Sequence, residues 1–521
     1  MAMADAIKQK VSIWILLTLV IPPLMVGVDL MIMGVAIEPL AVSLGVSISL
    51  LQWLLAGYAI GNASFYVIAG KLADMFGAKK IVNIGLLAFA IFSAAIALSD
   101  NIYWIIAFRI LQGAFGSFII IGALTWVAKS YEPEKRGVPT SAIVAGTGLG
   151  MSLGPVMGGL LIHFFSWRMA FWVNVPIAFI AMIFVSLLMK RRERAMSEIH
   201  FDIIGLVLLV ISMMSLTVYL SQGDNWGWLS HRALIVLAVF VVALIALLIA
   251  EAVIKHSLLD YPLFRVRQFF AGSFIAMLGY FIMIAWLFVF GIYLQSVYGF
   301  SALEAGLAFL PFSVVFFITA YVLTQIADKL NPKIVAITAF VLMALSTLSL
   351  AFVHECTPYW YITIGFALMA FGFVISTSLL VKVTMRHMPP EKTGLANGKM
   401  MMIRWFGSSL GAAVISTIFE QTAAHFLDRD LSHYPSLMSP ELSGKVLYAL
   451  KGSLPARQVK AMFPGHLYTD VSALLGHSYS HALRVSMWVL FGVAILGLIL
   501  SIVWLEGRKA PDSVSQPQNR A

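Results

Sequence analysis

Charged residues are scarce in this sequence of 521 residues. Asp, Glu, Lys and Arg together make up 11% of the chain, against roughly 25% in soluble domains. Hydrophobic residues make up 61%, and no soluble core of this length could bury so much apolar surface. A soluble globular protein is therefore excluded.

Cysteine is almost absent too, and several cofactor motifs are missing. Cys356 stands alone, which excludes an intramolecular disulfide, and no Cys/His cluster has the spacing of a zinc site. His477 and His481 lie one helical turn apart, but no further ligand completes a metal site around them. No Gly-rich loop ends in Gly-Lys-Ser/Thr, so ATP is not expected as the direct energy source. We predict no enzymatic activity, no cofactor and no bound metal.

Long apolar runs are what the sequence has in abundance. Its mean hydropathy is +0.93, and many runs reach the roughly 20 residues needed to cross a bilayer. The first run, from Ile13, is too long for a signal peptide and is interpreted as a spanning helix. We predict an all-α polytopic membrane protein with fourteen spans, near 13–37, 48–69, 81–98, 102–127, 138–162, 171–189, 203–221, 233–253, 270–295, 302–325, 333–353, 359–380, 394–419 and 484–505.

The basic residues follow the positions of the loops. The net charge of +10 is scattered between apolar runs, which does not favour nucleic-acid binding. If the N-terminus is cytoplasmic, clusters such as residues 190–194 lie inside, and the short outer loops hold only Arg168 and Arg232. The positive-inside rule therefore predicts that both termini are cytoplasmic.

The chain also repeats itself. The segment 70–79 after the second span is echoed by 324–333 after the tenth, with Asp74 matching Asp328 and Lys79 matching Lys333. Internal repeats are typical of secondary transporters. We predict a six-helix bundle in residues 1–200, two accessory helices in 201–256, and a second six-helix bundle in 257–521 that includes a long outer loop at 420–483.

The first copy of this repeated segment carries a recognisable motif. Gly70 and Gly77 permit tight turns, while Asp74 can bind a helix N-terminus or pair with a cation across the interface between the bundles. Together with Lys79 the segment resembles the signature between helices 2 and 3 of the major facilitator superfamily, which implies a role in conformational gating for these residues and for Asp328. The alternative is an ordinary cytoplasmic turn.

The fifth span carries a band of glycines at every fourth residue. Such a band lets another helix pack closely, and a proline within it bends the helix. The segment resembles the motif that marks antiporters in the same superfamily, although simple small-residue packing would need the same residues. Its members are Gly146, Gly150, Gly154, Pro155, Gly158 and Gly159.

Asp29 is an ionisable residue deep in the first span, which makes it a functional candidate. A carboxyl group that is wetted in one conformation and desolvated in another can take up and release a proton. The surrounding residues resemble the first-helix motif of the 14-helix drug:proton antiporter branch (EmrB/QacA type). Met31, Gly34 and Glu38 depart from that motif, and Asp29 as a plain interface residue is the alternative.

Two arginines also lie within predicted spans. Arg109, followed by Gln112 and Gly113, resembles the fourth-helix motif of the superfamily, which implies an influence on proton transfer; a helix anchor is the alternative. Arg404 lies in the penultimate span, where it would either attract an anionic group of a substrate in the central cavity or extend towards the inner face. Gln112 and Arg404 are our candidates for the substrate cavity.

The resemblance covers nearly the whole chain and implies a proton-coupled exporter of amphipathic small molecules or drugs in a bacterial inner membrane. The predicted partners are a small-molecule substrate, protons and the lipid bilayer, with a periplasmic adaptor protein and an outer-membrane channel as candidates that the long outer segment would bind. A dedicated exporter of an endogenous metabolite, such as a siderophore, is one alternative. A non-transporting receptor or scaffold is another.

Overall fold

The computed structural model describes residues 13–131, 137–189, 202–253, 267–326, 331–379, 393–434, 437, 439–451, 456–463 and 465–505. Fourteen helical segments in these ranges are long and apolar enough to cross a membrane, which confirms the predicted number of spans. No strand occurs in the described ranges. Helices are the expected solution, because a spanning segment must satisfy its own backbone hydrogen bonds in lipid.

The spans fall into three groups along the chain. The first six, here called the N-terminal half, are α1 (Ile13–Leu44), α3 (Trp53–Phe76), α4 (Ala78–Leu98), α5 (Ile102–Ser130), α6 (Gly137–Phe164) and the pair α7 (Met169–Trp172) and α8 (Asn174–Leu188), with the short α2 (Ile48–Leu51) after α1. Two further spans follow, α9 (Ile203–Trp226) and α10 (His231–Val253).

The last six spans, here called the C-terminal half, complete the bundle. They are α11 (Arg267–Ser296), α12 (Ala302–Ala308) with α13 (Leu310–Ile326), α14 (Pro332–Leu350), α15 (Tyr359–Val374) with the π-helical turn η5 (Ile375–Leu379), α17 (Thr393–Leu431) and α20 (His466–Trp504). Two short helices, α18 (Pro440–Lys451) and α19 (Ala456–Met462), lie between α17 and α20.

Local signals in the sequence define where several spans begin. Gly77 adopts a φ of +89° between α3 and α4, a conformation that favours glycine. The Asn101 side chain accepts a hydrogen bond from the Tyr103 N–H at 2.9 Å and caps α5. Ser301 and Glu304 form a reciprocal capping box at the start of α12. These ends fix the lengths of the connections between spans.

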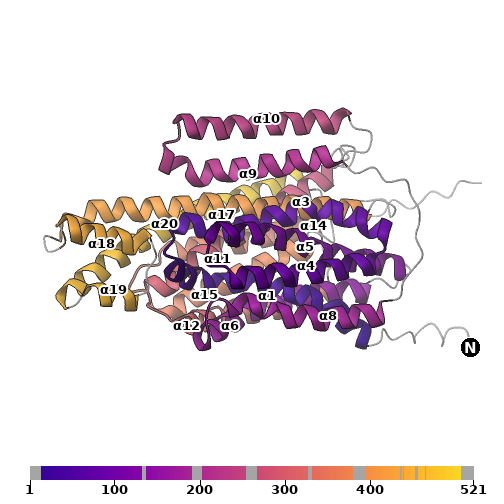
Figure 1. The fold of residues 1–521 in the computed structure, drawn as a ribbon, viewed down its shortest axis with the longest axis horizontal. Coiled ribbons are helices and arrows are strands. Elements are labelled where there is room, and N and C mark those ends of the chain that lie inside the picture. The colour runs from indigo at the N-terminus through magenta and orange to yellow at the C-terminus, as the bar shows by residue number, and fades with distance from the viewer. Residues whose placement is uncertain are drawn as a thin grey trace, which may run out of the picture.

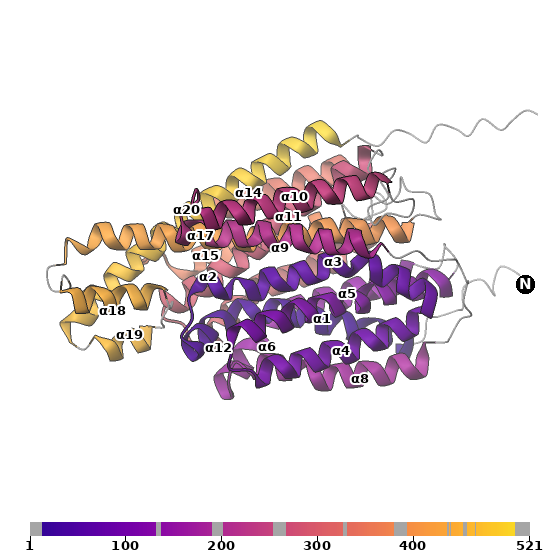
Figure 2. The same ribbon diagram turned by 45° about the horizontal axis from the view of Figure 1, so that its top comes forward.

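The helix pair α9 and α10 lies at the edge of the bundle, as Figures 1 and 2 show. Two contacts tie α9 to α17: the Thr217 and Ser409 hydroxyl groups lie 3.2 Å apart, and the Thr417 hydroxyl donates to the Leu220 carbonyl at 3.1 Å. Helix α9 also packs against α3 of the N-terminal half. It therefore covers a seam between the two halves, while α10 packs on α9.

The segment predicted as a long outer loop is largely helical. Helix α17 continues to Leu431 and α20 begins at His466, well before the predicted start of the last span at 484. A helix of 39 residues is about 58 Å long, far longer than the roughly 30 Å hydrocarbon layer. Hydropathy falls where the helix leaves lipid, but the backbone remains helical.

These helical extensions and α18 and α19 project from one end of the bundle, opposite the N-terminus (Figure 1). We call it the α18/α19 end. The Asp430 carboxylate of α17 lies 2.7 Å from Nδ1 of His477 in α20, and the Tyr479 hydroxyl donates to the Leu450 carbonyl of α18 at 2.8 Å. These bonds hold the extensions together.

The glycine band of α6 lies along α1. A Cβ atom at each of its four positions would overlap an atom of α1, and from Gly146 to Gly154, over about two turns, the atoms met include the backbone of α1. The contacts join Gly146 to Val20, Gly150 to Leu24, Gly154 to Val28 and Met31, and Gly158 to Ile32 and Val35. The band therefore sets the position of the helix that carries Asp29.

This packing predicts a large difference between two glycine substitutions. In Gly150→Ala the new methyl group would overlap the Leu24 carbonyl, whereas in Gly492→Ala it meets no atom within 4 Å. We expect Gly150→Ala to destabilise the protein by ~1–3 kcal/mol, because overpacking forces the helices apart. Thermal unfolding of both purified variants in detergent is the measurement. Equal stability of the two would contradict close packing of α1 on α6.

Candidate functional site

The site lies in the middle of the N-terminal half, where four spans meet. Asp29 of α1 and Arg109 and Gln112 of α5 are fully buried, together with Ser93 of α4 and Asn174 at the start of α8. Helix α5 reaches this position because Gly113 packs directly on the Tyr58 backbone of α3. Arg109 lies one turn before Gly113 on the same face of α5, and its guanidinium contacts both α3 and Asp29 of α1. Folding thus brings together three residues that the sequence analysis had singled out.

The Asp29 carboxylate accepts three hydrogen bonds. Arg109 donates from Nη1 to Oδ2 at 2.6 Å, and Oδ1 accepts from Gln112 Nε2 at 3.1 Å and from Asn174 Nδ2 at 2.7 Å. Charge-assisted bonds of this kind are roughly twice as strong as neutral ones. They stabilise the ionised carboxylate in a place that water does not reach.

The Arg109 guanidinium is held on several sides. Its Nε donates to the Leu54 carbonyl at 3.0 Å, and Nη1 also donates to Gln112 Oε1 at 2.6 Å. The group lies over the Tyr58 ring, 4.4 Å from the ring centroid, a favourable cation–π position. Nη2 has no hydrogen-bond partner among the described residues. Arg109 therefore keeps one free donor beside the carboxylate.

Ser93 and Asn174 complete the network, and the sequence analysis assigned them no role. The Ser93 hydroxyl accepts from Gln112 Nε2 at 2.6 Å and from Asn174 Nδ2 at 3.3 Å. Both residues are polar groups inside apolar runs, and buried polar groups in lipid are expensive unless they are bonded. The cost of burying a polar group was the signal in the sequence that pointed to these residues. Serine and asparagine are common enough in spans that this signal did not identify Ser93 and Asn174.

Asp74 and Lys79 of the predicted gating segment bond to residues of the N-terminal half in the described part of the chain. Asp74 pairs with Lys129 of α5 at 2.6 Å, and Lys79 donates to the Ser186 carbonyl of α8 at 2.6 Å. The Asp74 side chain is 57% exposed, and an exposed pair of this kind contributes at most about 1 kcal/mol. This conformation has no bond from Asp74 to the other half among the described residues.

The other residues predicted for gating form no polar contact between the described parts of the two halves. A Cβ atom at Gly70 would pack on Ile121, and one at Gly77 would meet no neighbour within 4 Å. Asp328 lies outside the described residues.

Pro155 and Gly159 of the glycine motif face the C-terminal half instead of α1. A Cβ at Gly159 would meet the backbone of Ala302, and one at Gly306 would overlap the Pro155 carbonyl. The two helices α6 and α12 thus touch backbone to backbone at the α18/α19 end. The motif of α6 supports both the packing of α1 and the contact between the halves.

Arg404 lies between α17 and α11 and is 2% exposed. Its Nη2 donates to the Tyr280 hydroxyl at 2.8 Å, and the guanidinium lies 4.4 Å from the centroid of that ring. Its Nε has no hydrogen-bond partner, and no carboxylate pairs with it in the described part of the chain. Arg404 is therefore a buried cation beside aromatic rings, not a residue extended to the inner face.

The neighbouring residue connects the two halves. The Trp405 indole N–H donates to the Tyr66 hydroxyl of α3 at 3.1 Å, and its ring meets those of Tyr58 and Tyr280 edge to face at 5.7 and 5.8 Å. Tyr58 also covers Arg109. A continuous series of aromatic contacts thus runs from the Asp29–Arg109 pair to Arg404.

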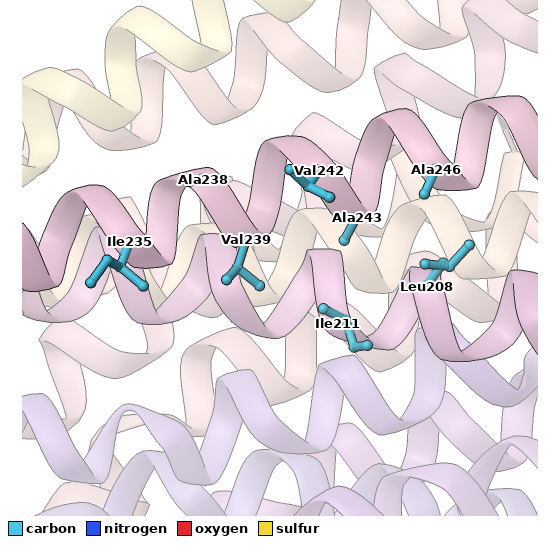
Figure 3. Close-up of a pocket in the computed structure, with 8 residues that line it drawn as sticks. All are labelled: Leu208, Ile211, Ile235, Ala238, Val239, Val242, Ala243 and Ala246. Carbon is cyan, nitrogen blue, oxygen red and sulfur yellow. The ribbon is translucent and has the colours of Figure 1, made fainter.

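A groove of about 440 Å³ lies between α9 and α10 (Figure 3). Every residue that lines it is Ala, Val, Ile or Leu, with Leu208 and Ile211 from α9 and the rest from α10. It offers no side-chain donor or acceptor to orient a polar molecule. We therefore place the candidate site at the buried charges and not in this groove.

Comparison with known proteins adds three findings. The family model described as Major Facilitator Superfamily matches residues 23–412. The tetracenomycin C resistance and export protein of Streptomyces glaucescens is 29% identical over 96% of this chain and 93% of its own length. The multidrug export protein EmrB of Escherichia coli K12 is 27% identical over 75% of this chain and 77% of its own.

Solved structures show the same fold. A bacterial homologue of the human lysosomal transporter Spinster, in an inward-facing and unoccupied conformation, aligns with a TM-score of 0.63. The alignment covers 96% of this chain and 98% of that one at 13% identity. The xylose transporter XylE of E. coli aligns with a TM-score of 0.57, also at 13% identity. At this identity the likeness concerns the fold alone.

The buried pair predicts strong coupling between two substitutions. Arg109→Gln leaves the buried Asp29 carboxylate without its counter-ion, so we expect a loss of ~3–5 kcal/mol in the free energy of unfolding. Adding Asp29→Asn to it should recover much of that loss, because no buried charge then remains unpaired. Unfolding of both single variants and the double variant in detergent measures the coupling. Arg168→Gln, which breaks the exposed pair with Asp100, is the control, with a loss below about 1 kcal/mol. Additive losses at positions 29 and 109 would contradict the pairing.

Proposed function

The chain belongs to the Major Facilitator Superfamily, and we propose that this transporter exports amphipathic small molecules in exchange for protons. The observation that supports the exchange most directly is the buried Asp29–Arg109 pair at 2.6 Å, with its bonds to Gln112 and Asn174. The names of the relatives, an antibiotic export protein and a multidrug export protein, support export of such molecules.

In the proposed mechanism Asp29 binds and releases the coupled proton. While the carboxylate is ionised, it holds α1 to α5 and α8 through its three bonds. Protonation removes the charge that Arg109 binds, so the guanidinium and Gln112 are free to form other bonds and α1 is free to shift. A proton that moves through the full membrane potential supplies about 2.3 kcal/mol per 100 mV. That free energy drives export against a gradient.

We propose that Arg404 recognises an anionic group of the substrate. The guanidinium is buried without a carboxylate partner among the described residues and keeps a free Nε. A buried cation of this kind favours a negatively charged ligand. Tyr280, Tyr66 and Trp405 surround it with ring faces and edges that suit flat apolar molecules. Gln112 is further from this cluster and serves the proton site in our proposal.

The remaining parts of the proposal concern location and partners. The distribution of Lys and Arg favours cytoplasmic termini in a bacterial inner membrane, so the α18/α19 end would face the periplasm. The helical extensions there offer a surface for a periplasmic adaptor protein, which would lead to an outer-membrane channel. Two further predictions from the sequence belong to the proposal. One is conformational gating by Gly70, Asp74, Gly77, Lys79 and Asp328. The other is the division of the chain into two six-helix bundles and an accessory pair of helices.

The second candidate function is export of one endogenous metabolite. It is favoured by the relative from S. glaucescens, whose name gives a single compound, tetracenomycin C. The departures of Met31, Gly34 and Glu38 from the first-helix motif also favour a specialised cavity. Drug susceptibility and metabolite profiles of a deletion strain distinguish the two candidates.

The proposal predicts that Asp29→Asn abolishes proton-driven export. The asparagine can still accept a hydrogen bond from Arg109, so we expect a folded protein, verified by gel filtration. The measurement is transport in proteoliposomes under an imposed pH gradient, where the rate should fall to that of empty liposomes. Asp100→Asn, at an exposed carboxylate, is the matched control and should transport normally. Full pH-driven transport by Asp29→Asn would refute the assignment.

The proposal also predicts that Arg404→Gln weakens binding of anionic substrates selectively. A hydrogen bond to a charged group contributes about 1.5–3 kcal/mol, so the Kd of a carboxylate-bearing substrate should rise about 10- to 100-fold. Its uncharged amide analogue should bind equally to both proteins. Arg267→Gln, at an exposed arginine that bonds the Val503 carbonyl, is the control. An equal loss for both ligands would contradict recognition of charge.

A further inference from the structure

Glu38 is a second buried carboxyl group on α1. Glu38 is only 5% exposed, and its Oε1 has no hydrogen-bond partner among the described residues. Nine residues separate it from Asp29, which places the two on opposite faces of the helix at 100° per residue. Glu38 therefore points away from the Asp29–Arg109 network, and the mechanism proposed above does not use it.

Glu38 faces the contact between the two halves. Helices α1 and α11 cross where Gly34 and Gly291 touch, since a Cβ at Gly291 would overlap the Gly34 carbonyl. One turn further along each helix lie Glu38 and Gln295. Gln295 donates from Nε2 to the Gly291 carbonyl at 2.8 Å and to the Val35 carbonyl at 3.5 Å. The carboxyl and the amide thus belong to buried residues one turn beyond the same backbone contact.

Gln295 shares the unusual feature of Glu38. It is 1% exposed, and its Oε1 also has no hydrogen-bond partner among the described residues. Glu38 Oε1 on α1 and Gln295 Oε1 on α11 are thus two acceptor oxygens that receive no hydrogen bond from the described residues. Both residues lie one turn beyond the contact of Gly34 with Gly291. A proton on the Glu38 carboxyl would supply the missing donor.

Glu38 forms no ion pair with any residue that the structure describes. Among the helices packed on α1, α6 carries His163, which is exposed, and α12 carries Glu304, which bonds Ser301 of its own cap. Arg168, just before α7, pairs with Asp100. On α11 the Tyr293 hydroxyl bonds Ser480 of α20. On α5, Arg109 is bound to Asp29 on the opposite face of α1.

We propose that Glu38 is a proton-binding site that must be occupied before α1 and α11 can close at the α18/α19 end. An ionised carboxylate buried without a partner costs several kcal/mol, and such a group becomes neutral instead. When this end opens, water reaches the carboxyl and the proton leaves for the solution. When it closes, the carboxylate takes a proton from a hydronium ion at the same end: an O–H bond of the hydronium breaks, the O–H bond of the carboxyl group forms, and a water molecule remains in the solution.

This role differs from that of Asp29. The proton enters and leaves Glu38 from the same side, so it adds nothing to the number of protons exchanged per substrate. Acid at that side favours the closed crossing, and alkali favours the open one. The inference concerns an equilibrium between conformations and holds whether or not export is driven by protons.

The test measures the crossing directly in the full-length protein. After Cys356→Ser, spin labels on cysteines at Ser43 and Ser296, near the ends of α1 and α11, report the distance between these helices in nanodiscs. We expect a short distance at acidic pH and a growing long-distance population as pH rises. For a single proton, the ratio of open to closed molecules changes by up to about tenfold per pH unit.

Two variants and a control decide the outcome. Glu38→Gln, which imitates the neutral carboxyl, and Glu38→Met, which removes its polarity, should both stay closed at every pH. Glu304→Gln, at the exposed carboxylate of the neighbouring helix, should keep the wild-type dependence. The infrared band of a protonated carboxyl group should be present at acidic pH and absent in both Glu38 variants. An unchanged pH dependence in Glu38→Gln, or its loss in Glu304→Gln alone, would overturn the proposal.

Asp29→Asn separates this inference from the proposed function. If the conformational change with pH persists in Asp29→Asn but disappears in Glu38→Gln, the proton-binding site at Glu38 is supported. This holds even if the transport assay shows no proton-driven export. If Asp29→Asn abolishes the change while Glu38→Gln retains it, the titrating group is Asp29 and the Glu38 proposal is wrong.

Discussion

The buried ion pair between Asp29 and Arg109 is the interaction on which the rest of the structure depends. Two charges in a lipid-surrounded bundle are costly unless they are paired and hydrogen-bonded, so α1, α4, α5 and α8 meet at one point, with α3 beside it. Asn174, Gln112 and Ser93 supply the additional donors and acceptors. The network contains this ion pair while the carboxylate is ionised, and in our proposal protonation of Asp29 weakens the pair.

Glycine contacts allow these helices to come so close. Gly113 lets α5 approach α3, and the band from Gly146 to Gly158 lets α6 support α1 from the other side. A second set, Gly34 with Gly291 and Gly159 with Ala302, joins the two halves at the α18/α19 end. One set therefore fixes the ion pair within a half, while the other closes one end of the bundle. Glu38 lies beside the second set, where a charge would oppose closure.

Much of the site was predictable because charge is so rare in this sequence. Asp29, Arg109 and Arg404 stand out inside apolar runs, and resemblance to known motifs gave Gln112 and the glycine band. Ser93 and Asn174 were missed, since one small polar residue in a span has many harmless positions. Asp74 was predicted to bond a helix N-terminus or to pair with a cation across the interface between the bundles, and in this conformation it pairs with Lys129 of its own half. Spacing in the sequence does not say which of several nearby cations a carboxylate will meet.

The sequence by itself determined that this is a helical membrane protein with fourteen spans, because hydrocarbon solvent permits only long apolar helices whose backbone is bonded internally. It also determined which few charges must be buried. Only the tertiary structure decided their partners, since Asp29 and Asn174 are 145 residues apart in the chain yet share a hydrogen bond. The tertiary structure also decided the helical extensions, which lie after residue 420 in α17 and before residue 484 in α20. Hydropathy marks where a helix leaves lipid and not where the helix ends. The same holds for Glu38: its carboxyl is plain in the sequence, but its burial against α11 is a property of the fold.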